Sequence, residues 1–164
     1  MIDDKEIIAD FCIECDGLFS QLEILLEDLE GDIENSAKLE KFGQIIDRAM
    51  GAAKALEAEQ IAAFCELGKI IGYKSSQVKD MNLRNVVVAV LFDTVDLLKK
   101  MIEGLKTGQN TLLKDLSPDA FVSRLKWLSE KFKDIERASV SFDTEDSVDL
   151  KQENIDDLMK QLGL

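Results

Sequence analysis

Apolar residues recur at alternating intervals of three and four positions through the N-terminal part of the chain. The run consists of Ile8, Phe11, Cys15, Leu18, Leu22, Leu25 and Leu29. This interval places all of them on one side of an α-helix, so the segment is predicted to form one long amphipathic helix. A single proline, Pro118, leaves the pattern downstream largely uninterrupted. The sequence therefore predicts an all-α fold, an antiparallel bundle of four to five helices.

The next three helices follow from the same interval. Asn35 or Ser36 can cap a second helix over 38–56, and a third is predicted from 58 to about 73. Residues 85–92 are rich in β-branched side chains, as strands often are. However, the helical interval continues to Leu105 and no second strand candidate could pair with this segment, so a fourth helix is predicted here.

A fifth helix is predicted after Pro118, which suits a first helical position because it lacks an N–H group. Its buried face is expected to consist of Phe121, Leu125, Leu128 and Phe132, with Trp127 packed beside it. Gly68 and Gly72, spaced four apart in the third helix, are expected to lie at a contact between helices.

The C-terminal region is predicted to be separate from the bundle. We expect a bundle over 1–137, a flexible acidic linker over 138–149 and a short helix over 150–164. Ile155, Leu158, Met159 and Leu162 give that helix a narrow apolar stripe. Because so short a helix is marginal alone in water, it is expected to stay largely unfolded until its stripe meets a groove on a partner protein. A final helix packed on the bundle is the alternative.

A formal net charge of −13 excludes several classes of partner. It repels nucleic acids and anionic membranes, so the partner is expected to be a protein. The longest apolar run, 86–92, is too short to span a bilayer and the N-terminus lacks a signal-peptide pattern, so a cytoplasmic location is expected.

The three cysteines, Cys12, Cys15 and Cys65, are too few for a structural zinc site because the chain contains no histidine. They are predicted to pack in the core, with redox sensing by the Cys12-x-x-Cys15 pair as the alternative. No metal or cofactor is expected from the chain itself.

The predicted second helix has a polar stripe of Glu40, Gln44, Asp47, Gly51 and Lys54. Asp47 and Gly51, among small alanines, resemble the phosphoacceptor helix of histidine-phosphotransfer (HPt) domains, which carries His-x-x-Lys-Gly-Ser-Ala. The end of the predicted first helix, residues 25–30, and the segment 93–101 of the predicted fourth helix also resemble the HPt domain of CheA kinases. The resemblance covers about residues 5–106. Asp47 stands at the histidine position and Met50 at the lysine position, so phosphotransfer is not expected. An unrelated four-helix bundle is the alternative.

The segment 152–164 resembles the C-terminal peptide by which CheZ chemotaxis phosphatases dock on the response regulator CheY. A similar peptide occurs in the flagellar switch protein FliM. The departure is the last residue, where CheZ usually has phenylalanine. The resemblance implies regulator-binding roles for Ile155, Asp156, Asp157, Leu158, Met159, Leu162 and Leu164.

The resemblance to CheZ also implies a reaction, the dephosphorylation of the regulator. In CheZ a glutamine orients the water that attacks the regulator's phosphoryl group, and an acid one helical turn away assists. Glu40 and Gln44 have this spacing on the polar stripe and are the candidate catalytic pair. Asp157 and Gln161 in the tail have the same spacing. The alternative to a catalytic role for Glu40 and Gln44 is that they belong to a solvent-exposed helix face without a function. Arg48 and Lys54 could offset the repulsion between Asp47 and a phosphoryl anion.

Together these features predict a chemotaxis or two-component signalling protein that binds a CheY-like response regulator and promotes its dephosphorylation, with any Mg²⁺ supplied by the partner. The alternative is a non-catalytic, HPt-like scaffold for a response regulator or a CheA-type kinase. A structural homodimer is the third reading.

Overall fold

The computed structural model describes residues 5–116, 118–138 and 152–164, and this part of the chain is helical without strands. Its helices are α1 (Lys5–Glu30), α2 (Ser36–Ala55), α3 (Glu59–Ser76), α4 (Met81–Lys106), α5 (Leu113–Leu116), α6 (Asp119–Ala138) and α7 (Gln152–Gln161). The all-α prediction is confirmed, including the helix over the β-branched segment 85–92. α6 ends at Ala138, the first residue of the expected linker, and the rest of that linker lies outside the described residues.

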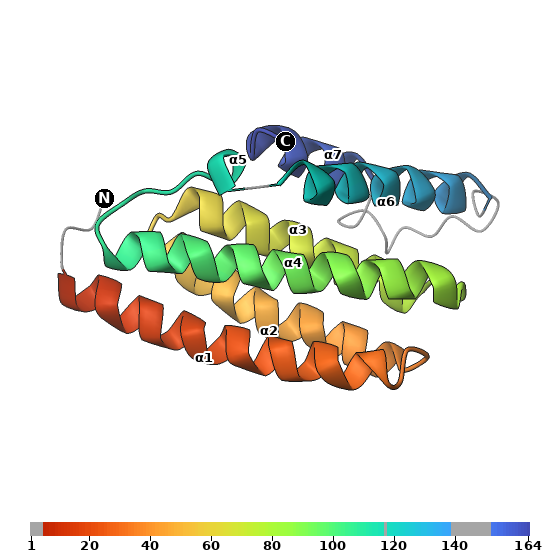
Figure 1. Cartoon of the computed structure of the whole chain (residues 1–164), viewed down its shortest axis with the longest axis horizontal. Helices are drawn as coiled ribbons and strands as arrows, with labels where there is room; N and C mark the ends of the chain where they lie inside the picture. Colours follow the sequence, from red (N-terminus) through yellow and green to blue (C-terminus); the bar gives the residue numbers. More distant parts are fainter. Residues whose placement is uncertain (1–4, 117, 139–151) are drawn as a thin grey trace.

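The four long helices α1 to α4 form an antiparallel bundle (Figure 1). Each packs on its neighbour along the chain, and α1 also packs on α4, which closes the ring. Local signals start the helices: the Asn35 side chain accepts a hydrogen bond from the Lys38 amide before α2, and Asp80 accepts two before α4. Gly108, in the left-handed conformation with φ of 79°, ends α4 as a C-cap glycine should.

The helices α6 and α7 lie over one side of this bundle (Figure 1). α6 packs on α4, while α7 packs on both α3 and α6. Consequently α3 is covered on most of its circumference, and its buried residues include the consecutive run 61–65. Within the described residues, α3 is therefore both a member of the four-helix ring and the helix that α7 covers from outside.

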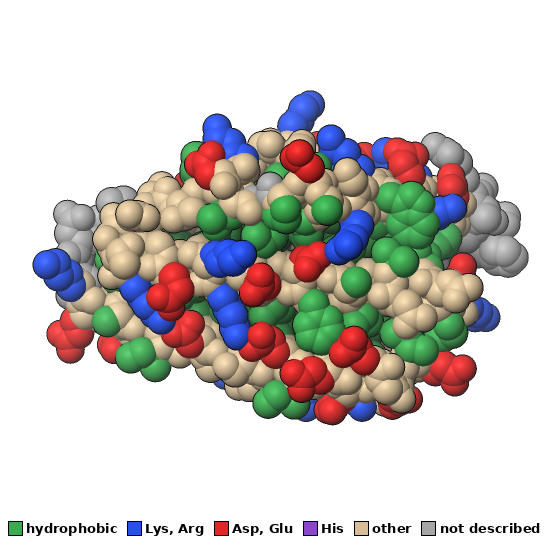
Figure 2. All heavy atoms as spheres, in the orientation of Figure 1, with side chains coloured by type: hydrophobic (Ala, Val, Ile, Leu, Met, Phe, Trp, Pro, Cys, Tyr) green, Lys and Arg blue, Asp and Glu red, His purple; other side chains and the backbone are tan. Residues whose placement is uncertain are grey.

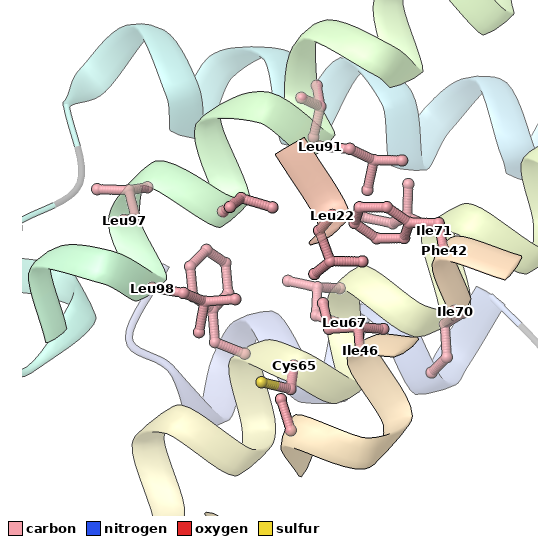
Figure 3. Close-up of a cluster of buried hydrophobic side chains, with 14 of the residues drawn as sticks. Leu22, Phe42, Ile46, Cys65, Leu67, Ile70, Ile71, Leu91, Leu97 and Leu98 are labelled. Carbon is pink, nitrogen blue, oxygen red and sulfur yellow. The ribbon is translucent and has the colours of Figure 1, made fainter. Parts of the chain in front are cut away.

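The core is built from long aliphatic and aromatic side chains (Figure 3). Phe42 and Ile46 of α2 meet Leu67 and Ile71 of α3, with Leu91 of α4 close by. Phe121 of α6 makes an edge-to-face contact with Phe64 at a centroid distance of 6.1 Å. The prediction for Trp127 is wrong: it is 44% exposed, with Lys131 above its ring, because it lies outside the α6 stripe that meets α4.

Two glycines allow α2 and α3 to approach closely. A Cβ atom added at Gly68 would lie 2.8 Å from Cδ1 of Ile46, and one at Gly72 would lie 3.2 Å from Cδ1 of Phe42. The predicted helix contact at these glycines is confirmed, since a methyl group at either position would crowd the Ile46 or Phe42 side chain of α2.

A buried arginine joins three separate segments. The Arg84 guanidinium, 3% exposed, donates to the carbonyl oxygens of Ile33, Ser76 and Val78 and to the Ser36 hydroxyl, over 2.7–3.1 Å. It therefore connects the α1–α2 turn with the C-terminal end of α3, where helix carbonyls have no partner within the helix.

None of the helices described is both long and apolar enough to cross a lipid bilayer.

Replacing Gly68 with alanine should lower the free energy of unfolding by about 1–3 kcal/mol, because the new methyl group must displace the buried Ile46. Gly17→Ala is the matched control: it also lies within a helix, but its Cβ would meet nothing within 4 Å. This control should raise stability by up to about 1 kcal/mol. Urea denaturation measures both, and equal effects would contradict the close packing of α2 on α3.

Arg84→Met should lower the free energy of unfolding by about 3 kcal/mol, since buried carbonyl groups lose their donors. Arg48→Met, at an exposed arginine, should change it by no more than about 0.5 kcal/mol. Chemical denaturation of the two variants compares them directly, and similar losses would show that the Arg84 hydrogen bonds stabilise nothing.

Candidate functional site

The outward face of α2 carries the predicted polar stripe. Glu40, Gln44, Arg48, Gly51 and Lys54 are exposed, while Asp47 is half-buried. The opposite side closes the core, and its residues Leu39, Phe42, Ile46, Ala49 and Ala53 have no exposed surface. We use the term α2 face for Glu40, Gln44, Asp47, Arg48, Gly51 and Lys54. The predicted division of this helix into an apolar and a polar side is confirmed.

Asp47 forms an ion pair with a lysine of α3. Its Oδ1 atom lies 2.9 Å from Nζ of Lys69. The two side chains are 47% and 37% exposed, so the pair is open to solvent and its contribution to stability is small. Its effect on the site is electrostatic, because a cation now stands beside the carboxylate that would repel a phosphoryl group.

Gln44 and Glu40 lie in successive turns of α2, and both are exposed. Within the described part of the chain, neither side chain has a hydrogen bond or an ion pair with another residue. A carboxamide can donate and accept a hydrogen bond at once, and a carboxylate can accept one. The two side chains are therefore available for hydrogen bonds to groups outside the chain.

Gly51 leaves the α2 face flat one turn beyond Asp47. A Cβ atom added there would meet nothing within 4 Å. A partner surface can thus approach the helix backbone closely at this point.

The C-terminal helix occupies a groove of its own chain. Ile155, Leu158, Met159 and Leu162 are at most 8% exposed and face α3 and α6. The expectation of a separate helix that stays unfolded until it meets a partner is wrong for this structure. The physical reason is that α3 and α6 supply the apolar groove, so burial of the stripe stabilises the helix within the chain.

Two of the described acids of α7 differ in their contacts. Asp156 accepts a hydrogen bond from Ser129 Oγ over 3.0 Å and pairs with Lys133 at 3.2 Å, so it helps to hold α7 on α6. Asp157 is exposed, as is Gln161, and Leu164 is half-buried. Leu164 closes a Schellman C-cap in which Gly163 has a φ of 78°.

A shallow cleft between α6 and α7 is lined by equal numbers of lysines and acids: Lys126, Lys133 and Lys160 with Glu130, Asp156 and Asp157. Because the charges balance, the cleft favours neither an anion nor a cation.

Lys69 is the residue of the site that the sequence analysis missed. It lies 22 positions from Asp47, and no local pattern connects the two. Only the antiparallel packing of α2 on α3 brings them together.

The residues that the structure describes contain no group of three or more potential ligands placed to hold a metal ion. The three cysteines are buried. Burial raises the pKa of the Cys15 thiol to about 12 and raises the pKa values of Cys12 and Cys65 above their ordinary range. Such thiols stay protonated and behave as core side chains, as predicted.

Comparison with known proteins assigns no family, because no family model, curated protein or solved structure matches this chain.

The raised thiol pKa values make stability depend on alkaline pH. An unfolded thiol ionises near pH 9, whereas folded Cys15 ionises near pH 12, so the protein loses stability as pH rises through this window. Each such thiol should contribute a slope of at most about 1.4 kcal/mol per pH unit. The free energy of unfolding, measured by chemical denaturation at several pH values between 8 and 11, should therefore fall less steeply with pH for Cys15→Ala than for the intact protein. An equal fall with pH in both proteins would contradict this account of Cys15.

Proposed function

We propose that this chain is a helical-bundle partner of a CheY-like receiver domain and that it docks the receiver through the α2 face. The observation that carries the proposal is the construction of α2, whose inner side closes the core while its outer side presents a flat polar surface. An HPt domain uses the corresponding helix to present its phosphoryl group to a receiver.

The charge of α2 supports an anionic target. This helix contains four lysine or arginine residues and two acids, although the whole chain has a net charge of −13. Asp47 is offset by Lys69, and Arg48 and Lys54 lie on the same face. A phosphorylated aspartate on a receiver would meet the most positive long helix of the bundle.

Binding alone does not require chemistry by this chain. Without histidine it has no imidazole to accept the phosphoryl, and in this proposal the phosphate of a docked receiver either persists or is hydrolysed. The exposure of Glu40 and Gln44 in successive turns favours hydrolysis. In that reaction Gln44 orients a water whose oxygen bonds to phosphorus as the bond to the aspartyl oxygen breaks. Inorganic phosphate and a free carboxylate result, and Mg²⁺ held by the receiver would offset the negative charge that develops.

In this proposal α7 is a secondary binding site for the receiver, after the α2 face. Its apolar stripe is buried on α3 and α6, so a receiver can take it only after α7 leaves that groove. The affinity of a receiver for the stripe is then its intrinsic affinity multiplied by the fraction of molecules in which α7 is undocked. Primary docking on α2 avoids this cost.

Gly51→Arg should abolish receiver binding, because its side chain would stand between the α2 face and the receiver without disturbing the core. With a phosphorylated CheY-like receiver, the intact protein should speed loss of phosphate, and Gln44→Ala should slow that catalysed loss by about 100-fold with binding retained. Calorimetry measures binding and phosphate release measures the rate.

Two controls make these results specific. Gly17→Arg places the same bulk on an exposed glycine of α1, and Gln21→Ala removes an exposed glutamine there. Both should leave binding and rate unchanged. Binding with an unaltered phosphate lifetime would make the chain a non-catalytic scaffold, and absence of binding would reject the proposal. Truncation after Ala138 is unsuitable, since it would uncover the groove on α3 and α6.

A further inference from the structure

The outward side of α1 carries two large apolar side chains in water. Ile13 is 70% exposed and Ile24 is 60% exposed, the highest values among the large hydrophobic residues described. They are eleven positions apart, which is close to three helical turns, so they lie on the same side of α1 about 16 Å apart. Gly17 and Ser20, both exposed, lie between them. We call Ile13, Gly17, Ser20 and Ile24 the α1 face.

Acidic residues border the α1 face on both sides. The sequence from Glu6 to Ala37 contains ten acids and no lysine or arginine. Toward α4, Asp16 and Glu23 form ion pairs with Lys106 and Lys99.

The remaining acids near the α1 face are uncompensated. Asp10, Glu14, Glu27 and Asp28 are exposed and have no ion pair within the described residues. Figure 2 shows acidic side chains along α1 at the lower edge of the molecule, with hydrophobic side chains between them.

We infer that the α1 face binds a basic amphipathic helix of a partner protein. Ile13 and Ile24 would gain from burial, and the small residues between them let a second helix approach closely. The acids on each side would pair with lysines or arginines that flank the partner's apolar stripe.

The charge pattern of α1 favours a basic helix over nucleic acids, anionic lipid surfaces and a second copy of this chain. Nucleic acids and anionic lipid surfaces would be repelled by the acids of α1. A second copy bound through the same face would place two acidic helices against each other, which opposes a symmetric dimer here. The α1 face is also distinct from the α2 face, so this inference stands or falls independently of receiver docking.

The test uses a synthetic helix with leucines on one side and lysines on the other, titrated into the full chain by calorimetry at low and moderate salt. The intact protein should bind it, more weakly as salt increases. The double variant I13S/I24S should bind about tenfold more weakly, since two isoleucines no longer contribute burial. The triple variant D10N/E14Q/D28N should lose affinity and most of the salt dependence.

Ile7→Ser is the matched control, since Ile7 is another exposed isoleucine of α1 but lies on a different side of the helix. It should bind as the intact protein does, and circular dichroism should confirm that every variant is folded. Equal binding by I13S/I24S and the intact chain would overturn the inference, as would equal binding of a peptide with scrambled leucines. A dimer in sedimentation equilibrium that I13S/I24S converts to monomer would assign the face to a second copy and overturn it as well.

Discussion

The close packing of α2 on α3 determines which side chains of α2 face the solvent. Gly68 and Gly72 let Ile46 and Phe42 of α2 reach the α3 backbone. This contact fixes the rotation of α2, and a fixed rotation leaves its polar stripe facing outward. It also brings Lys69 within 2.9 Å of Asp47, so the electrostatics of the α2 face depend on a packing interaction.

The sequence predicted the features of the fold that depend on local signals. The interval of three and four gave the long helices, Asn35 was foreseen as a possible cap, and the small glycines of α3 predicted a helix contact. The two sides of α2 could be assigned for the same reason, because periodicity alone separates core from surface. Exposure of Gln44 and Glu40 follows from that periodicity without knowledge of the neighbouring helices.

The features that were missed depend on residues far apart in the chain. Lys69 of the site and the acceptors of Arg84 at Ile33 and Ser36 leave no periodic signal. The location of α7 is the clearest case. An apolar stripe on a short helix predicts that a groove will cover it, but the stripe is the same whether the groove belongs to the chain or to another protein. Only the packing of α3 and α6 decides between them.

The distribution of charge distinguishes the two proposed binding surfaces on neighbouring helices. α1 has eight acids and one lysine, whereas α2 has more basic than acidic residues. Under the two proposals above, a phosphorylated receiver would be repelled from α1 and attracted to α2, and a basic helix would have the opposite preference. Such a difference in sign would steer each partner before any contact forms, so the two would not compete for the same surface.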